Sequence, residues 1–199
     1  MTAIHSRVAL TPEAVPFAIR AEKVSDVVAR EALLDACFGA NRHVGTCQRL
    51  RDGRAPADGL ALSAMARGKV VGTVRLWHVS AGGAPALVLG PLAVGSAFRK
   101  LGVGAALITR ALAAARARGH RAVLLLGDAA YYSRFGFSAA KTGELTLPGA
   151  YEHERLLGLE LAEGALDGAW GMIVPTGGAL PKPKAVRARK VAHLVPRVA

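Results

Sequence analysis

Hydrophobic residues follow two different spacings along the chain, and the two spacings alternate in a way that predicts a mixed sheet with helices. Short runs that alternate with polar residues, or are apolar throughout, are bounded by glycine-containing turns, as is typical of strands. The strands are predicted near residues 17–20, 60–67, 70–80, 84–94, 122–127 and 156–161. Helical spacing predicts helices over 24–38 and 105–118. A short helix is also expected within the polar, arginine-rich connection at 39–59, and another after Asp128 as its N-cap.

The turns and caps support this order of elements. Gly68 and Lys69 suit a hairpin turn, and the AGG segment at 81–83 suits the next turn. Gly119 suits a left-handed end for the second helix, and Asp128 suits an N-cap. The run at 122–127 is apolar on both faces, which indicates a central strand. The fold class is therefore α+β with a mixed sheet.

The length of 199 residues, with 52% hydrophobic residues, suits one domain with tails. Residues 1–15 lack the layout of a secretory signal and are expected to form a flexible leader. Residues 16–178 are expected to form the domain. Residues 179–199 are rich in proline and basic residues, so we expect an extended or disordered tail.

The formal net charge of +12 is unevenly distributed. Half of it lies in residues 182–199, which contain six basic residues and no carboxylate. The remaining excess suits an anionic small ligand as well as a phosphate backbone. Aromatic residues make up only 5% of the chain, and none interleaves with the basic segments, which argues against nucleic acid as the main partner.

The sequence gives little support to a membrane protein, a disulfide-linked protein or a metal-binding protein. No apolar run approaches the roughly 20 residues of a membrane-spanning helix, so we expect no membrane partner and a cytoplasmic location. Cys37 and Cys47 form no close pair and are expected to be reduced thiols. The six histidines show no metal-ligand spacing, so no metal is expected.

The segment LAVGSAFRKLGVGAALITRAL, residues 92–112, carries the clearest chemical signal. Free N–H groups and the helix dipole favour anions where a helix begins. Gly102 and Gly104 remove side chains from that point, and Arg99 and Lys100 add charge beside it, so the segment predicts a phosphate site. The dinucleotide fingerprint fails because Leu107 stands at its third glycine, and the Walker loop fails because Ala105 follows Gly104.

The segment resembles the Arg/Gln-x-x-Gly-x-Gly/Ala pattern of the GCN5-related N-acetyltransferases (GNAT), which follows a strand ending in valine. The later YYSRFGF resembles their second signature, a tyrosine ahead of Gly-Phe, and GD-x-x-YY-x-RFGF is similar to the bacterial YhbS-like branch. The likeness spans about residues 17–175. The sequence departs from the common pattern at Gly95-Ser96, where Asp/His-Pro is usual, and at Lys100, where glycine is common.

The resemblance implies a three-layer α/β fold with a mostly antiparallel sheet, helices on both faces and a splayed pair of central strands. It also implies acetyl-CoA, or a longer acyl-CoA, as co-substrate. The pantetheine would pair with the main chain of 92–94, and the pyrophosphate would lie on the amides of 99–104. The implied CoA-binding residues are Leu92, Ala93, Val94, Arg99, Lys100, Leu101, Gly102, Val103, Gly104 and Ala105.

For catalysis, the resemblance implies that Tyr132 is the general acid for the leaving thiolate, with Tyr131 as its rival by one residue. A backbone N–H near Val94 would face the carbonyl oxygen. The strand at 84–94 carries no carboxylate. His78 or a chain of water molecules therefore remains as the route for the proton of the amine.

The expected reaction is acyl transfer to an unidentified amine by a monomer or homodimer. Two alternatives stay open, a non-catalytic acyl-CoA sensor and a basic protein associated with nucleic acid or the ribosome. The segments 39–59 and 142–155 are expected to wall the acceptor cleft. Arg42, Arg49, Arg51 and Arg54 suggest an anionic acceptor or an acidic carrier protein, although a solvated basic loop is the simpler explanation.

Overall fold

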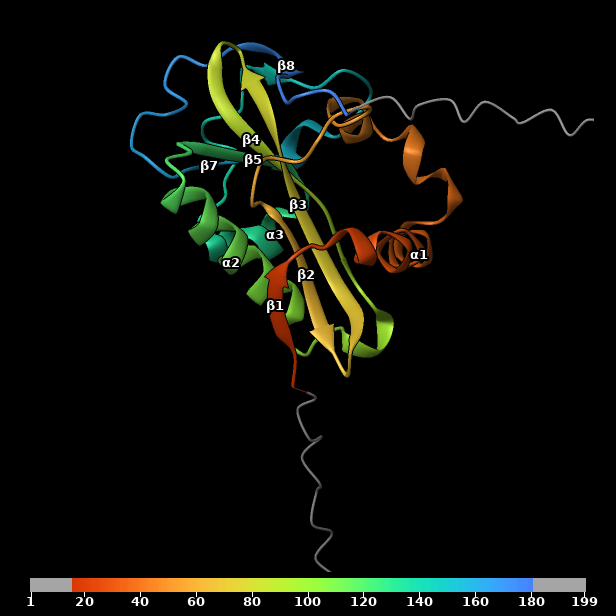
Figure 1. The fold of residues 1–199 in the computed structure, drawn as a ribbon. Coiled ribbons are helices and arrows are strands. Elements are labelled where there is room, and N and C mark those ends of the chain that lie inside the picture. The colour runs from red at the N-terminus through yellow and green to blue at the C-terminus, as the bar shows by residue number, and fades with distance from the viewer. Residues whose placement is uncertain (1–15, 181–199) are drawn as a thin grey trace, which may run out of the picture.

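The computed structural model describes residues 16–180, which form a twisted sheet with helices on both sides (Figure 1). The strands are β1 (Ala18–Ala21), β2 (Ala61–Ala66), β3 (Lys69–Ala81), β4 (Ala84–Val94), β5 (Ala122–Leu126), β6 (Leu145–Thr146), β7 (Leu156–Glu160) and β8 (Gly171–Pro175). The helices are α1 (Val27–Phe38), α2 (Val103–Ala117) and α3 (Ala129–Tyr132). The expected leader at 1–15, and the basic tail from residue 181 on, lie outside the described residues.

Six short 3-10 helices complete the structure. They are η1 (Val24–Asp26), η2 (Ala40–Val44), η3 (Thr46–Leu50), η4 (Ser96–Phe98), η5 (Ser133–Phe135) and η6 (His153–Arg155). None of the helices between residues 16 and 180 has the length and hydropathy that a membrane-spanning helix needs.

The sheet is mixed and mostly antiparallel, as predicted. Its main path runs β1-β2-β3-β4-β5-β7, and β8 pairs with β3 and with β6 beside this path. Within residues 16–180, only two pairs of strands are parallel, β4 with β5 and β6 with β8. The β4–β5 ladder holds just two residue pairs, Leu87 with Val123 and Val88 with Leu124. The two central strands therefore separate after Val88.

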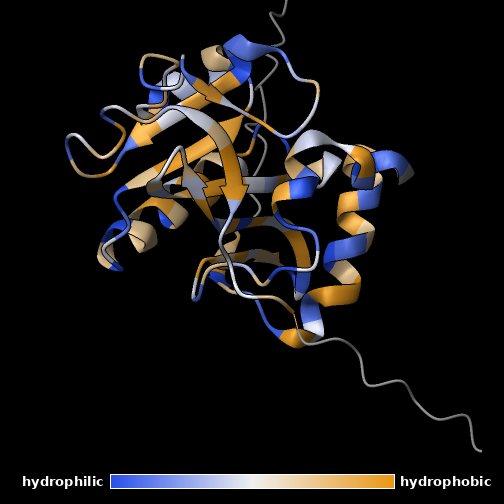
Figure 2. Ribbon diagram, turned by 90° about the horizontal axis from the view of Figure 1, so that it is seen from above, coloured by the Kyte–Doolittle hydropathy of each residue, from blue (hydrophilic) through white to orange (hydrophobic). Residues whose placement is uncertain are grey.

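The helices cover both faces of the sheet, with α1 on one side and α2 and α3 on the other (Figure 1). In Figure 2 the hydrophobic colours follow the strands, and polar residues gather on the loops. The predicted stripe of α2 is fully buried and comprises Leu107, Ile108, Ala111, Leu112 and Ala115. A Cβ at Gly72 of β3 would lie 3.0 Å from both Leu107 and Val103, so this glycine lets the first turn of α2 approach the sheet closely.

Most predicted elements are present, with local differences. The hairpin turn comprises Arg67 and Gly68 rather than Gly68 and Lys69, and both turn residues have positive φ, 49° and 74°, as a tight hairpin of this twist requires. Gly119 is left-handed, with a φ of 76°. Asp128 caps α3 by accepting a hydrogen bond from the N–H of Ala130 at 2.9 Å. Segment 39–59 forms two 3-10 helices instead of one short helix.

A buried carboxylate ties the start of α1 to the sheet. Asp26 accepts two hydrogen bonds from the Arg20 guanidinium, at 2.6 and 2.8 Å, and one from the Lys23 N–H at 2.8 Å. The Ser63 hydroxyl of β2 donates a further bond at 3.3 Å. The Arg20 guanidinium, followed by the Lys23 amide, holds the pKa of Asp26 well below its usual range.

Replacing this carboxylate should destabilise the fold strongly. We expect Asp26→Asn to lower the free energy of unfolding by about 3 kcal/mol, because the buried end of the Arg20 side chain loses its counter-charge. Asp35→Asn is the matched control, since the exposed Asp35 carboxylate of α1 pairs with Arg42 at the surface. That variant should lose less than about 1 kcal/mol. Urea unfolding at pH 7 measures both.

The difference in the free energy of unfolding between wild type and Asp26→Asn should depend on pH. The pKa of Asp26 is lower in the folded state than in the unfolded chain, so its contribution is present above about pH 4 and is lost as the pH falls further. The gap between wild type and Asp26→Asn should therefore shrink below pH 4. Equal stability of the two Asn variants at pH 7 would contradict this assignment.

Candidate active site

The separation of β4 from β5 leaves one edge of β4 open. Beyond Val88, β4 continues to Val94 with β3 as its neighbour and no longer pairs with β5, whose other edge pairs with β7 along its whole length. The N–H of Gly95 donates to Val71 of the segment that pairs with β4, at 2.9 Å. Because peptide groups alternate along a strand, the groups of Val94 and Leu92 point the other way, toward the opening.

The main chain of Ala93 points toward β3, where Ala93 pairs with Thr73. Of the three residues predicted to pair with pantetheine, the structure thus turns Leu92 and Val94 to the open edge and not Ala93. The carbonyl of Val94 agrees with this direction, since the side chains that donate to it lie outside β3: it accepts hydrogen bonds from the Nε of Arg99 at 3.3 Å and from the Sγ of Cys37 at 3.5 Å.

Helix α2 begins beside the end of this edge with its amides unpaired. None of the N–H groups of residues 100–105 donates to another described residue, and no side chain caps the helix. The chain reaches this arrangement through two left-handed residues, Lys100 with a φ of 62° and Gly102 with a φ of 81°. Lys100 is the position where the motif usually has glycine, and the positive φ explains that preference.

A cavity of about 460 Å³ lies over these amides, and we call it the helix-end cavity. It is lined by Val94, Phe98, Arg99, Lys100, Gly102, Val103, Gly104, Ala105, Tyr131 and Arg134. Three of these side chains are cationic and none is a carboxylate. The combination of unpaired N–H groups, a helix N-terminus and three cations favours a polyanion, such as a diphosphate.

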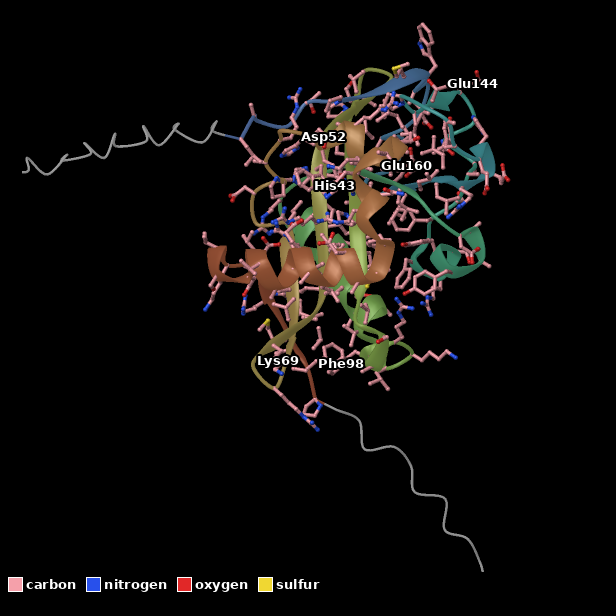
Figure 3. The ribbon with its side chains drawn as sticks, turned by 90° about the vertical axis from the view of Figure 1, so that its right-hand side faces the viewer. His43, Asp52, Lys69, Phe98, Glu144 and Glu160 are labelled. Atoms are coloured by element: carbon pink, nitrogen blue, oxygen red, sulfur yellow. The ribbon has the colours of Figure 1, made fainter. Side chains whose placement is uncertain are left out.

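A second cavity, of about 430 Å³, lies beside the beginning of the open edge, and we call it the loop cavity. It is lined by Phe38, Arg42, Gly45, Thr46, Cys47, Gln48, Arg51, Leu89, Gly90, Pro91, Leu92, Leu126 and Tyr132. Leu92 lines this cavity and Val94 lines the other, so the open edge of β4 connects the two. In Figure 3, His43 and Asp52 of the 39–59 segment lie on one side of α1, and Phe98 lies on the other.

The two adjacent tyrosines belong to different cavities. Tyr132 lines the loop cavity, and Tyr131 lines the helix-end cavity, where its hydroxyl lies 3.2 Å from the place of a Cβ at Gly104. Neither hydroxyl has a hydrogen-bond partner among residues 16–180. Burial, with a smaller effect of Tyr131, raises the pKa of Tyr132 to about 12. Tyr132 is therefore protonated at neutral pH and free to donate.

Some of the other predicted site residues line a cavity, and others do not. Arg99, Lys100, Gly102, Val103, Gly104 and Ala105 all line the helix-end cavity, but Leu101 is exposed and does not. His78 lines neither cavity and lies beside His120, with ring centroids 5.3 Å apart. Arg134 was not predicted. It follows Tyr131 by three positions, which places both on one helical face, and its guanidinium lies 3.9 Å from the Tyr131 ring centroid.

Comparison with known proteins agrees with this geometry. The model of the acetyltransferase (GNAT) family matches residues 29–137. The uncharacterized N-acetyltransferase YhbS of Escherichia coli K12 is 33% identical over 166 residues, which cover 78% of this chain and 93% of YhbS.

Two solved structures are similar over the greater part of the chain. The crystal structure of Escherichia coli YhbS in complex with CoA has a TM-score of 0.69 and 30% identity, and the match covers 84% of this chain and 94% of that one. A GNAT family acetyltransferase from Brucella melitensis in complex with acetyl-CoA has a TM-score of 0.57 and 25% identity, with 85% and 94% covered. The family match, the shared sequence and the shared fold together show that this chain belongs to the GNAT family of acetyltransferases.

Proposed function

We propose that this protein transfers an acetyl group from acetyl-CoA to an amine, with Tyr132 as the general acid. One observation carries the proposal: the open edge of β4 leads from the unpaired amides at the start of α2 to the cavity that Tyr132 lines. The complexes of YhbS with CoA and of the Brucella melitensis enzyme with acetyl-CoA support acetyl-CoA as the donor.

The diphosphate of CoA would occupy the helix-end cavity. The N–H groups of residues 100–105 are its hydrogen-bond donors, and the dipole of α2 adds partial positive charge. Arg99, Lys100 and Arg134 supply full charges from the wall of the same cavity. Gly102 and Gly104 keep the approach to the amides free of side chains.

The pantetheine arm would follow the open edge of β4. It carries two amide groups, which match the outward main-chain groups of Leu92 and Val94 as an added strand would. This path brings the thioester from the helix-end cavity to the loop cavity. The amine acceptor would enter through the loop cavity, where the lining residues include Tyr132.

In the reaction, the amine nitrogen attacks the thioester carbonyl and forms the new C–N bond. Charge develops on the carbonyl oxygen, and an outward N–H of the open edge of β4 stabilises it. The C–S bond then breaks, and the Tyr132 phenol donates its proton to the leaving sulfur. The loop cavity is lined by neither a carboxylate nor a histidine, so water takes the amine proton and restores the phenol.

The direct test mixes acetyl-CoA with a panel of primary amines and measures release of the CoA thiol. We expect acetyl-CoA to bind with a micromolar dissociation constant by calorimetry, and at least one amine to release thiol above the rate of hydrolysis. If the protein binds no CoA at millimolar concentration, the proposal fails. If it binds acetyl-CoA and no amine releases thiol, the acyl-CoA sensor replaces the transferase.

Tyr132→Phe should lower kcat about 100-fold and change the dissociation constant of acetyl-CoA less than about 2-fold, because only proton donation is lost. Tyr131→Phe is the matched control, since it removes the neighbouring hydroxyl from the other cavity. Its kcat should stay within about 2-fold of wild type. An equal loss of kcat in the two variants would contradict the assignment of the acid.

The pH profile provides an independent check of the acid. Because the pKa of Tyr132 is about 12, its proton is retained throughout the neutral and mildly alkaline range. The value of kcat/KM should therefore rise with pH as the amine loses its proton, with no falling limb up to about pH 10. A fall in kcat/KM below pH 9 in the wild type, absent in Tyr132→Phe, would mean that Tyr132 loses its proton in that range. This result would contradict a raised pKa for Tyr132.

Lys100→Gly should separate backbone strain from charge. Removing the left-handed lysine should raise Tm by about 2 °C, and losing its cation should weaken CoA binding about 3- to 10-fold at low salt. Arg67→Gly is the matched control, because Arg67 also has positive φ but lies in the β2–β3 turn. Its Tm should rise similarly without any change in CoA affinity. Unchanged CoA affinity in Lys100→Gly would remove Lys100 from the diphosphate site.

A further inference from the structure

Arg51 lines the loop cavity with a charge that no carboxylate balances. It follows η3 and is half-buried, yet it forms no ion pair with any carboxylate of the described chain. Its one side-chain hydrogen bond runs from Nε to the Oε1 of Gln48 at 2.9 Å. The two terminal NH2 groups, which form the fork that binds carboxylates end-on, are left without a partner among residues 16–180.

Arg42, the other cation of the loop cavity, differs in this respect. Its Nε donates to Asp35 at 2.7 Å, and its NH2 donates to Glu31 at 2.5 Å. The loop cavity itself is lined by no Asp or Glu. Burial is the main reason that the pKa of Arg51 is lowered from its ordinary value. The Cys47 thiol and the Asp52 carboxylate, neither of which forms an ion pair with Arg51, act in the opposite direction and have a smaller effect.

The guanidinium also lies beside the place of reaction. Its Nη1 is 3.5 Å from the position that a Cβ would take at Gly90 of β4. Gly90 comes two residues after Val88, the last residue of β4 that pairs with β5. Arg51 is thus placed at the beginning of the open edge, in the cavity that Tyr132 also lines.

We propose that Arg51 binds an anionic group of the acceptor, so that the preferred substrates are amines that also carry a carboxylate or a phosphate. This inference rests on the proposed acetyl transfer and adds the class of acceptor. An anion would supply the counter-charge that the fold omits, through two parallel hydrogen bonds from the guanidinium. The neutral residues on the cavity wall provide no competing anion.

Gln48 is the positioning residue for this contact. Its Oε1 accepts from Arg51, and its Nε2 donates to Asp52 at 2.5 Å, so the amide is held from both ends. With Nε engaged by Gln48, the terminal groups of the guanidinium keep their hydrogen-bonding capacity for a ligand of the cavity that Arg51 lines. The carboxylate of Asp52 bonds to Gln48 and forms no ion pair with Arg51.

The test compares matched acceptors in the full-length protein with acetyl-CoA. β-Alanine and 4-aminobutyrate are compared with their carboxamides, and O-phosphoethanolamine with ethanolamine, so that the carboxylate and the phosphate are separate arms. The variants are Arg51→Met, Arg51→Lys and Arg49→Met. Arg49 is the control because it is exposed, precedes Arg51 by two residues and does not line the loop cavity.

For the wild type, we expect kcat/KM to favour the anionic member of at least one pair about 10- to 100-fold. Arg51→Met should abolish this preference and leave the rate with the neutral partner within about 2-fold, while Arg51→Lys restores part of it. Arg49→Met should behave as wild type. The dissociation constant of acetyl-CoA should be unchanged in all variants, which shows that they fold.

Three outcomes would overturn the inference, and they differ from failure of the proposed function. If neutral amines react as fast as their anionic partners, or if Arg51→Met keeps the preference, the acceptor is not bound through Arg51. If Arg51→Met changes only the ratio of kcat/KM for succinyl-CoA and acetyl-CoA as donors, Arg51 contacts the acyl group of the donor and not the acceptor. If no amine of the panel releases thiol, the acetyl transfer itself fails, and this inference fails with it.

Discussion

The separation of β4 from β5 after Val88 is the constraint on which the site depends. Two parallel central strands share only two residue pairs and then diverge, while β5 stays paired with β7 and β4 stays paired with β3. Main-chain groups that a regular sheet would pair are thereby left at an open edge in the middle of the protein. Unpaired peptide groups at such a place are stabilised by a ligand with amides of its own.

The rest of the architecture extends this edge at both ends. At one end, Gly72 lets α2 approach the sheet closely, and the left-handed residues Lys100 and Gly102 aim its unpaired amides at the same place. At the other end, the 39–59 segment and Tyr132 enclose the loop cavity. The cations are distributed accordingly, with three around the amides and Arg51, which has no ion pair among the described residues, in the wall of the loop cavity.

The sequence predicted most of the elements and the position of the helix end, because both depend on local signals. Apolar spacing located most of the sheet, and Gly102 and Gly104 marked the helix end. The direction of the main-chain groups of Ala93 could not be predicted from local signals. It depends on the register of β4 with β3, and this register shifts between Val74 and Leu76. Strands β6 and β8 were not located, because two and five residues without clear alternation give little periodic signal.

The cavity walls depend still more on tertiary structure. Segment 39–59 has no helical or strand period, so its two 3-10 helices, and the burial of Arg51 among them, follow from packing. Four arginines of this segment looked alike in the sequence. Only the fold distinguishes Arg42, with its two carboxylate partners, from Arg51, which has none among the residues described.

Amide hydrogen exchange of the protein with and without CoA is the measurement that tests the central claim most directly. The account predicts that saturating CoA slows exchange at the N–H groups of residues 100–105 and of Leu92 or Val94. The N–H of Ala93 should be unaffected, because it already faces β3. If CoA binds and these amides exchange as fast as before, the open edge and the helix end are not where the carrier lies.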